Sequence, residues 1–233
     1  MQTATYQQRR GQLETYFDRT AMEAWARLTS DAPVSRIRAT VRAGRDAMRA
    51  TLLSWLPADL RGRRLLDAGC GTGALAVEAA RRGAQVVAID VAPRLIELAR
   101  ERTPRDLGEG SIEFRAGDML DPALGRFDHV VAMDSLIHYN AADCVGAIAA
   151  LAARTAGSVV YTYAPRTPAL TVMHAAGRLF PRSERAPAIQ PISENVMQRL
   201  LVAAPGLRNW QAARTQRVAS GFYKSQAMEI CRS

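Results

Sequence analysis

The stretch Leu65-Leu66-Asp67-Ala68-Gly69-Cys70-Gly71-Thr72-Gly73 decides the fold of this 233-residue chain. A short apolar run ends in an acidic residue, and glycines follow at alternate positions. Because glycine has no Cβ and adopts positive φ, the backbone of such a turn can pass under a ligand at contact distance. The next residues predict a helix over 74–82, whose free N–H groups point at the same place. The pattern therefore predicts a strand, a turn and a helix that bind a nucleotide-like cofactor.

A second acidic residue indicates an adenosine-containing cofactor. The strand expected over 85–90 ends in Asp90, where a carboxylate can accept hydrogen bonds from both ribose hydroxyls. Gly69, Gly71 and Ala74 also satisfy the loose dinucleotide pattern G-x-G-x-x-G/A. The glycines alone therefore leave nicotinamide and flavin cofactors open.

Asp67 and Gly73 separate these alternatives. An acid two places before the first glycine, with a further glycine at 73, resembles motif I (D/E-x-G-x-G-x-G) of the class I S-adenosylmethionine-dependent methyltransferases. In that family the strand-end acid lies near the methionine part of the cofactor, whereas a pyrophosphate would be repelled by it. The resemblance implies S-adenosyl-L-methionine as cofactor and S-adenosyl-L-homocysteine as product. The cofactor-binding residues that it implies are Asp67, Gly69, Cys70, Gly71, Gly73, Asp90, Val91, Asp118, Met119, Met133, Asp134 and Ser135.

Strands and helices alternate along the chain after residue 63. The patterns predict strands over 64–67, 85–90, 112–116, 127–133 and 158–163. They predict helices over 74–82, 93–102, 141–153 and 193–203, the first helical position of the second being Pro93. Two more strands, 210–218 and 222–230, flank Ala219-Ser220-Gly221 and form an antiparallel hairpin. The fold class is α/β, with a Rossmann-like doubly wound seven-stranded sheet.

Two parts lie outside this minimal fold. Residues 1–57 are expected to form a helical cap or lid on a methyltransferase domain over 58–233, and residues 165–192 a proline-rich insertion on the substrate side. Two apolar stripes at helical spacing support the cap. They consist of Tyr16, Phe17, Met22, Trp25 and Leu28, and of Ile37, Val41, Met48, Leu52 and Trp55.

Composition is that of an ordinary globular enzyme, with 48% hydrophobic residues. No apolar run is long enough to span a membrane, no secretory signal is evident, and three scattered cysteines indicate reduced thiols without a metal site. The net charge of +9 comes almost entirely from arginine, with Lys224 as the one lysine. Because the arginines are dispersed, we expect no nucleic-acid partner; the charge favours an anionic substrate or loose attachment to an anionic membrane.

Four segments carry a narrower resemblance. They are Tyr16-Phe17-Asp18-Arg19-Thr20-Ala21-Met22-Glu23-Ala24-Trp25, Val34-Ser35-Arg36-Ile37-Arg38, the motif over 67–73, and Met133-Asp134-Ser135-Leu136-Ile137-His138-Tyr139. Together they resemble the magnesium-protoporphyrin O-methyltransferases of bacteriochlorophyll and chlorophyll synthesis over nearly the whole chain, most weakly in 165–210. The resemblance implies methyl transfer to a propionate of magnesium protoporphyrin IX, giving the monomethyl ester. It further implies transient contact with magnesium chelatase and a cytoplasmic location, at most peripheral to the intracytoplasmic membrane.

Catalytic candidates lie just past the strand expected over 127–133. His138 is the hydrogen-bond donor expected beside the reacting carboxylate, with Tyr139 as a second candidate. Cyanobacterial and plant relatives carry a tyrosine shortly after a Trp-x-Arg-aliphatic segment, where this chain has Thr29. If that tyrosine takes part in the relatives' chemistry, Thr29 or Tyr16 takes its place here.

The acceptor remains the most open part of the interpretation. Arg36, Arg38, Arg166 and Arg178 are unranked candidates to hold carboxylates, and His174 is a candidate ligand for the porphyrin magnesium. His129, in the middle of a strand, is expected to be structural. A phenol of a quinone precursor is the alternative acceptor, with His138 as general base. A porphyrin carrier without turnover and an RNA methyltransferase are further alternatives.

Overall fold

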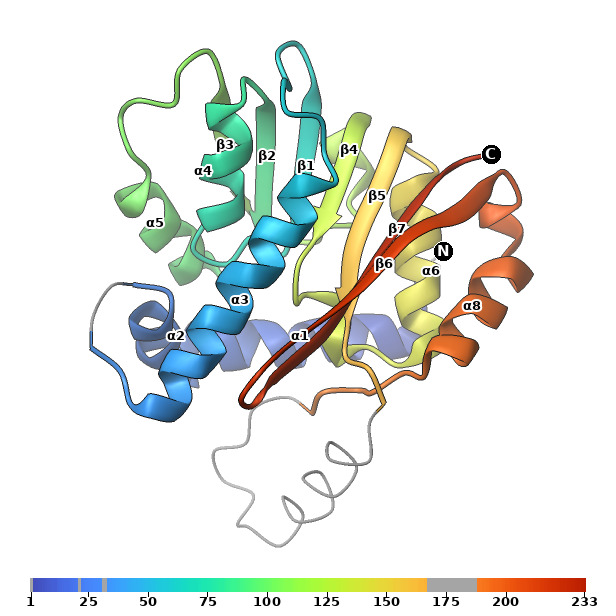
Figure 1. Ribbon diagram of the computed structural model, residues 1–233, viewed down its shortest axis with the longest axis horizontal. Helices are drawn as coiled ribbons and strands as arrows, with labels where there is room; N and C mark the ends of the chain where they lie inside the picture. Colours follow the sequence, from blue (N-terminus) through green and yellow to red (C-terminus); the bar gives the residue numbers. More distant parts are fainter. Residues whose placement is uncertain (1, 21, 31–32, 167–187) are drawn as a thin grey trace, which may run out of the picture.

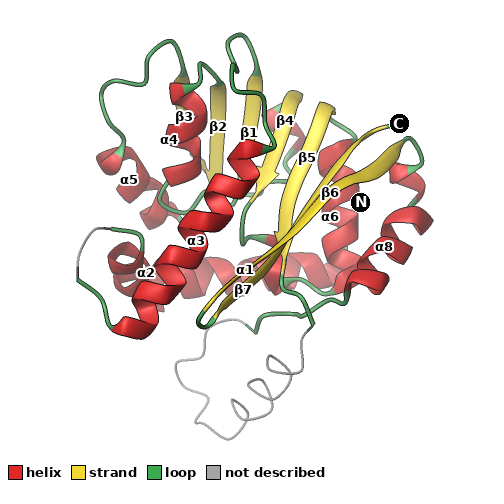
Figure 2. Ribbon diagram, in the orientation of Figure 1, coloured by secondary structure: helices red, strands yellow, loops and turns green. Residues whose placement is uncertain are grey.

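The computed structural model describes residues 2–20, 22–30, 33–166 and 188–233, and its centre is one seven-stranded sheet (Figures 1 and 2). The strand order is β3-β2-β1-β4-β5-β7-β6. The strands are β1 (Arg64–Ala68), β2 (Gln85–Asp90), β3 (Ser111–Ala116), β4 (Phe127–Ala132), β5 (Thr155–Tyr163), β6 (Trp210–Ser220) and β7 (Tyr223–Arg232). β1 to β5 are parallel, while β7 is antiparallel to both β5 and β6. The predicted doubly wound sheet is confirmed.

Helices cover both faces of the sheet because the inner strands carry apolar side chains on both of their faces. Leu65 belongs to a core cluster that includes buried residues of α3 (Arg36–Ser54) and α4 (Ala74–Arg81). Its neighbour Leu66 belongs to the opposite cluster, formed with α6 (Ala141–Ala152) and α8 (Glu194–Ala203). A strand buried on two faces reads as a continuous apolar run, as the sequence does here. The remaining sheet helix is α5 (Pro93–Arg102).

The N-terminal residues are helical, as predicted. They form α1 (Ala4–Thr15), a π-helical turn η1 (Tyr16–Thr20), α2 (Met22–Leu28) and the long α3. In Figure 1, α1 runs beneath the carboxyl ends of the parallel strands, and α3 crosses the near face of the sheet. Tyr6 and Leu13 of α1 are buried in the core cluster of the α6 face. The N-terminal segment therefore packs against the edge where ligands of doubly wound sheets bind.

The residues of the expected apolar stripes differ in how far they are buried. Met48 and Leu52 are fully buried, but Ile37 is 56% exposed, near the first turn of α3. Helical spacing gives the period of a stripe and not how far along the helix its packing partners reach. The side chain of Met22 lies outside the described residues.

Several boundaries differ from the predicted ones by a few residues. β5 begins at Thr155, which pairs with Phe127 of β4, three residues before the predicted start. The final hairpin turns at Gly221-Phe222 rather than around 219–221, with Gly221 at a φ of +54°. Most of the predicted insertion lies outside the described residues, although Pro165 and Ile192 pair at its two ends. Among the helices that the structure describes, none combines the length and apolar character that a membrane span requires.

Candidate active site

The glycine-rich turn after β1 has little room for side chains. Gly69, Gly71 and Gly73 have φ values of +83°, +53° and +79°. A Cβ on Gly69 would overlap the Cβ of Ser135, and one on Gly71 would lie 3.3 Å from the Trp25 indole nitrogen. Positive φ and close approach therefore both favour glycine here. The turn lies between β4's end and the N-terminal helices.

Two carboxylates beside this turn have different surroundings. Asp90 accepts hydrogen bonds from the backbone N–H groups of Gly71, at 2.9 Å, and Ala92, at 3.0 Å. Asp67 is almost fully buried, and its Oδ2 has no hydrogen-bond partner among the described residues. Burial, and next the negative charge of Asp90, raise the pKa of Asp67 to about 7. A buried carboxylate with a free oxygen is suited to a cationic group such as the ammonium of a methionine moiety.

A cavity of about 640 Å³ opens above the turn. The predicted site residues that line it are Tyr16, Thr29, Asp67, Gly69, Cys70, Gly71, Asp90, Val91, Met119, Met133, Asp134, Ser135, His138 and Tyr139. Gly73 and Asp118 do not line it. The sequence thus predicted most of one continuous surface, contributed by the ends of β1, β2 and β4 and by the N-terminal segment.

Asp118 is engaged with the N-terminal helix. Its Oδ1 accepts a hydrogen bond from the Tyr6 hydroxyl at 2.9 Å. Its Oδ2 accepts from Gln2, at 2.8 Å, and Arg10, at 3.1 Å. Tyr6 in turn stacks on Tyr139 with ring centres 4.8 Å apart. The residue expected near the adenine therefore also holds α1 against the sheet, a role that the sequence did not reveal.

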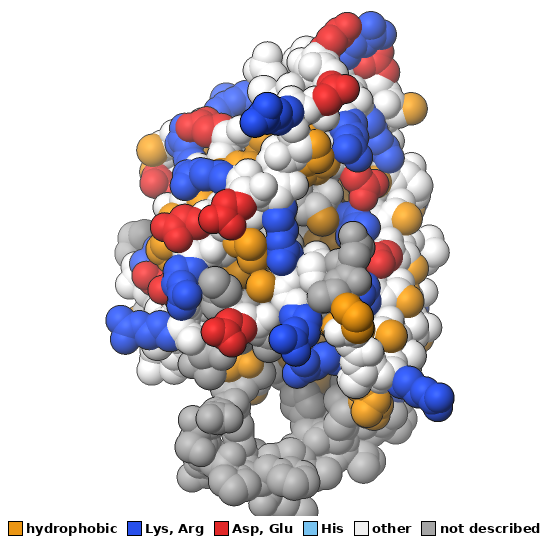
Figure 3. All heavy atoms as spheres, turned by 90° about the vertical axis from the view of Figure 1, so that its left-hand side faces the viewer, with side chains coloured by type: hydrophobic (Ala, Val, Ile, Leu, Met, Phe, Trp, Pro, Cys, Tyr) orange, Lys and Arg blue, Asp and Glu red, His pale blue; other side chains and the backbone are white. Residues whose placement is uncertain are grey.

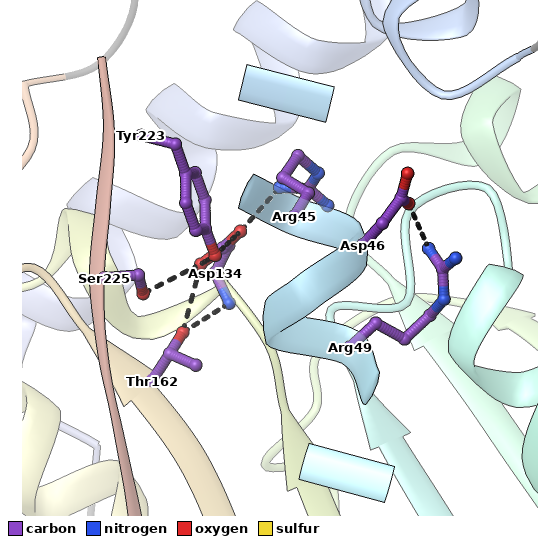
Figure 4. A network of polar contacts seen from close by, with 7 residues as sticks. All are labelled: Arg45, Asp46, Arg49, Asp134, Thr162, Tyr223 and Ser225. Atoms are coloured by element: carbon purple, nitrogen blue, oxygen red, sulfur yellow. Dashed lines mark hydrogen bonds and ion pairs between the residues drawn. The ribbon is translucent and has the colours of Figure 1, made fainter. Parts of the chain in front are cut away.

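Asp134 is the centre of a polar network that joins four elements (Figure 4). Its carboxylate accepts hydrogen bonds from Arg45 of α3 at 2.6 Å, Tyr223 at 3.1 Å and Ser225 at 3.3 Å, both of β7, and Thr162 of β5 at 3.2 Å. It has a φ of +54°, which no other non-glycine residue in the described parts of the chain shares. This carboxylate anchors α3 and the final hairpin to the end of β4, and it also lines the cavity.

His138 and Tyr139 follow β4 in the short 3-10 turn η3 (Leu136–His138) and its cap. His138 is 8% exposed, and its ring meets the edge of Phe17 from η1 with ring centres 5.9 Å apart. Burial raises the pKa of the Tyr139 hydroxyl well above its ordinary value. The Tyr139 hydroxyl therefore remains a neutral hydrogen-bonding group at the cavity wall near neutral pH.

Thr29 and Tyr16 also lie at the cavity, on the N-terminal side. The Thr29 hydroxyl donates to the Trp25 carbonyl at 2.8 Å and accepts from Arg102 at 3.1 Å. The same carbonyl accepts a hydrogen bond from the Thr29 N–H at 3.0 Å, so Thr29 caps the C-terminal end of α2 with both its backbone and its side chain. Tyr16 is half-buried, which raises the pKa of its hydroxyl.

Basic side chains on one face of α3 border the cavity and were mostly missed in the sequence. Arg38, Arg42, Arg45 and Arg49 line it, joined by Lys224 from the final hairpin. Their i, i+4, i+7, i+11 spacing was the available signal, because residues so spaced share one helix face. Of the predicted carboxylate ligands, Arg38 lines the cavity and Arg36 and Arg166 do not, while Arg178 and the candidate magnesium ligand His174 lie outside the described residues.

Other charged and titratable groups lie away from the cavity. His129 on β4 shares a hydrogen bond of 2.9 Å with Ser158 of β5, and burial lowers its pKa, as expected for a structural residue. On the face shown in Figure 3, Lys and Arg side chains are interspersed with Asp and Glu. Cys144 and Cys231 are free thiols outside the cavity lining, and Cys70, which lines the cavity, is free as well.

The reversed last strand, the glycine-rich turn and the two strand-end acids define a class I S-adenosylmethionine-dependent methyltransferase. A general methyltransferase-domain model matches residues 65–156, and the model for the magnesium-protoporphyrin IX methyltransferase C-terminus matches 132–232. A magnesium-protoporphyrin O-methyltransferase of Rhodobacter capsulatus is 51% identical over 96% of this chain and 97% of its own length. The chain belongs to the magnesium-protoporphyrin O-methyltransferase family.

More distant relatives agree with this assignment. The magnesium-protoporphyrin O-methyltransferase of Synechocystis is 29% identical over 94% of both chains. The crystal structure of magnesium protoporphyrin IX methyltransferase from Synechocystis PCC 6803 with bound SAH superposes with a TM-score of 0.83, at 28% identity, covering 96% of this chain and 99% of that one. The likeness extends over the N-terminal helices and the final hairpin as well as the cofactor turn.

Proposed function

We propose that this protein transfers a methyl group from S-adenosyl-L-methionine to a propionate carboxylate of magnesium protoporphyrin IX, forming the monomethyl ester and S-adenosyl-L-homocysteine. The observation that carries the proposal is the single cavity that joins two kinds of wall. One wall holds Asp67 and Asp90 beside the glycine-rich turn, and the other holds His138, Phe17 and basic residues of α3. The first suits a cationic adenosine cofactor and the second an apolar acceptor with an anionic edge.

The positively charged cofactor is complementary to the two carboxylates beside the turn. The unpartnered Oδ2 of Asp67 is the proposed acceptor for the methionine ammonium, and Asp90 for the ribose hydroxyls. Cys70, Val91, Met119, Met133 and Ser135 complete this wall. Asp118 does not line the cavity, and its proposed role toward the adenine rests on its position next to Met119. When bound, S-adenosylmethionine supplies a methyl group already activated by its sulfonium centre.

The acceptor needs little acid–base chemistry. A propionate has a pKa of about 4 in water, so near neutral pH it is already a nucleophile. The chain's task is to hold its oxygen in line with the methyl group and to exclude water. Desolvation raises a carboxyl pKa, so a hydrogen-bond donor must stabilise the anion. His138 is the proposed donor, with Tyr139 and Tyr16 as neighbouring hydroxyls at the same wall.

The N-terminal segment is proposed to act as the lid of the cavity. Tyr6, Phe17 and Trp25 line the cavity from α1, η1 and α2. These short elements meet the sheet through a few side-chain contacts, such as those of Asp118, and segments of this kind open at low free-energy cost. We propose accordingly that residues 1–57 form the cap and 58–233 the domain that binds the cofactor.

Two associations complete the proposal. The net charge of +9 supports loose attachment to an anionic membrane surface. The low solubility of a metalloporphyrin makes direct delivery favourable, which supports transient contact with magnesium chelatase. We propose both associations for a protein located in the cytoplasm.

Methyl transfer tests the proposed function directly. Purified protein is incubated with methyl-labelled S-adenosylmethionine and magnesium protoporphyrin IX, and the porphyrin product is separated and identified. We expect a labelled monomethyl ester. Binding of the cofactor without labelling of the porphyrin would contradict the proposal, and a parallel incubation with a quinone-precursor phenol would then test the alternative acceptor.

A further inference from the structure

We propose that Arg38 of α3 and Lys224 of the β6–β7 hairpin form a subsite for a second carboxylate of the acceptor, the one that is not methylated. This proposal rests on the proposed function and adds the residues that distinguish a dicarboxylate porphyrin from a monocarboxylate. Neither α3 nor the hairpin belongs to the cofactor motif. The positive charges of Arg38 and Lys224 are therefore not needed for the glycine-rich turn to form.

The hairpin reaches the cavity because its tip packs on the start of α3. In Figure 1, β6 and β7 extend past the edge at which the parallel strands end, towards the lower part of α3. A Cβ on Gly221 would overlap Thr40, and a Cβ on Gly44 would lie 2.5 Å from Tyr223. These contacts place the residues that follow the tip beside the turn of α3 that carries Arg38. Phe222 and Lys224 both line the cavity together with Arg38 and Val41.

The basic side chains that line this cavity differ in whether they have partners for their charge. Arg45 pairs with Asp134, and Arg49 pairs with Asp46 at 3.0 Å and Glu78 at 2.7 Å. Within the parts of the chain that the structure describes, the side chains of Arg38 and Lys224 have neither an ion pair nor a hydrogen bond. Arg42, the fifth basic residue of the wall, donates to the carbonyls of Leu28 at 3.0 Å and Arg27 at 2.9 Å. The charges of Arg38 and Lys224 are therefore available to an anionic ligand.

The chemistry of this pair matches a carboxylate attached to an apolar ring. Arginine offers a planar pair of donors that matches a carboxylate, and lysine adds a mobile point charge. Phe222 precedes Lys224 by two residues and lines the same cavity, and it is 57% exposed although it is a large apolar side chain. An exposed apolar residue beside unpaired cations suits a flat ring with an anionic edge.

Porphyrin titration compares wild type with Arg38→Gln and Lys224→Gln. Each variant removes one charge without removing polarity, and Arg208→Gln, an exposed site outside the cavity, is the charge-matched control. Quenching of tryptophan fluorescence reports Kd, and methyl transfer reports KM and kcat. We expect Kd and KM for magnesium protoporphyrin IX to rise about tenfold or more in each cavity variant, as for loss of a charge-assisted hydrogen bond. The kcat value and the Kd of S-adenosylmethionine remain within about twofold.

A second porphyrin tests whether the two cations act on a carboxylate of the acceptor. In a magnesium porphyrin with both propionates converted to amides, no carboxylate can occupy the subsite, so wild type and both variants should bind it with similar affinity. Unchanged Kd for the dicarboxylate in both variants, or an equal loss with the amide, would overturn the subsite. Absence of methyl transfer by the wild type would overturn the proposed function instead, while the binding titration would still test the subsite.

Discussion

The guanidinium of Arg45 lies between the end of β4 and the N-terminal helices. Its Nη1 is 2.6 Å from Asp134 Oδ2, and its Cζ is 4.6 Å from the centre of the Trp25 ring. Trp25 in turn lies beside Gly71 of the cofactor turn. One side chain of α3 therefore connects the buried carboxylate of the sheet edge to the aromatic residue above the cofactor turn.

Removing this cation should destabilise the fold. Arg45→Met leaves Asp134 buried without a countercharge, and loss of one partner from a buried pair costs about 3 kcal/mol or more. Arg49→Met is the matched control on the same helix, because its partners Asp46 and Glu78 are 51% and 42% exposed. Urea unfolding should show a change of about 1 kcal/mol or less for that variant. Equal losses in the two variants would contradict the buried role of Arg45.

Gly69 and Ser135 form a pair that can be tested by compensation. Gly69→Ala places a methyl group at a φ of +83° and against the Ser135 Cβ, so cofactor affinity should fall by about tenfold or more. Adding Ser135→Gly removes the overlapping atom and should restore part of the affinity, although the backbone strain remains. Calorimetric titration of S-adenosylmethionine measures both, with Ser135→Gly alone as the reference. A double variant that binds no better than Gly69→Ala would show that the overlap is unimportant.

Asp67 makes the stability of the ligand-free protein depend on pH. Its folded-state pKa of about 7 lies above the unfolded value of 3.8, so the folded protein retains a proton that the unfolded chain has lost. Stability falls as pH rises from about 4 to 7, by up to about 4 kcal/mol from this group. Asp67→Asn should therefore be more stable than wild type at pH 8, with the difference vanishing near pH 4. Unfolding curves across this range measure it.

The same group couples cofactor binding to protons. A bound ammonium lowers the pKa of Asp67, so binding at pH 7 should release a fraction of a proton. Titration calorimetry in two buffers with different ionisation enthalpies reveals this release, which should be absent in Asp67→Asn. Proton release of equal size in the variant would assign the effect to another group.

His138 should affect turnover far more than cofactor binding. We expect His138→Ala to lower kcat by about 100-fold, the usual scale for one positioned donor, with S-adenosylmethionine affinity within about twofold of wild type. His129→Asn is the control, because His129 bonds to Ser158 away from the cavity, and its kcat should be retained. Wild-type turnover in His138→Ala would remove that residue from the mechanism.

The lid should respond both to the cofactor and to one tyrosine. Tyr6→Phe loses the hydrogen bond to Asp118, so α1 should open more readily, by about 1 kcal/mol. Hydrogen exchange over residues 4–15 would then be faster than in wild type, whereas Glu14→Ala, on the exposed face of α1, should leave it unchanged. Cofactor should slow exchange in residues 10–40 of the wild type. Equal exchange with and without cofactor would count against a moving lid.

Local sequence patterns were sufficient for the cofactor half of the molecule. The turn over 67–73 and the strand-end Asp90 are adjacent in the chain or in neighbouring parallel strands, so motif spacing places them correctly. The sheet strands were predicted to within three residues because apolar runs bounded by turns mark them.

The acceptor half depends on contacts that no local pattern encodes. Tyr6 reaches Asp118 across 112 positions, and Tyr223 reaches Asp134 across 89. Ile37 has the spacing of a stripe residue but is 56% exposed, and Arg45 has the character of a solvent-exposed residue but pairs with the buried carboxylate of Asp134. How the two ends of the chain fold back onto the sheet therefore decides which residues of α3 and of the final hairpin face the cavity.

The packing of the β6–β7 tip on α3 has a consequence for the order in which the molecule forms during synthesis. The residues around the glycine-rich turn come from the middle of the chain, and their strands can pair while the C-terminal residues are still being added. β6 and β7 follow every other described element, and Gly221 must find Thr40 across most of the chain. The strands around the cofactor turn can therefore pair early in synthesis, whereas the part of the cavity wall that contains Phe222 and Lys224 forms only after the final hairpin has been translated.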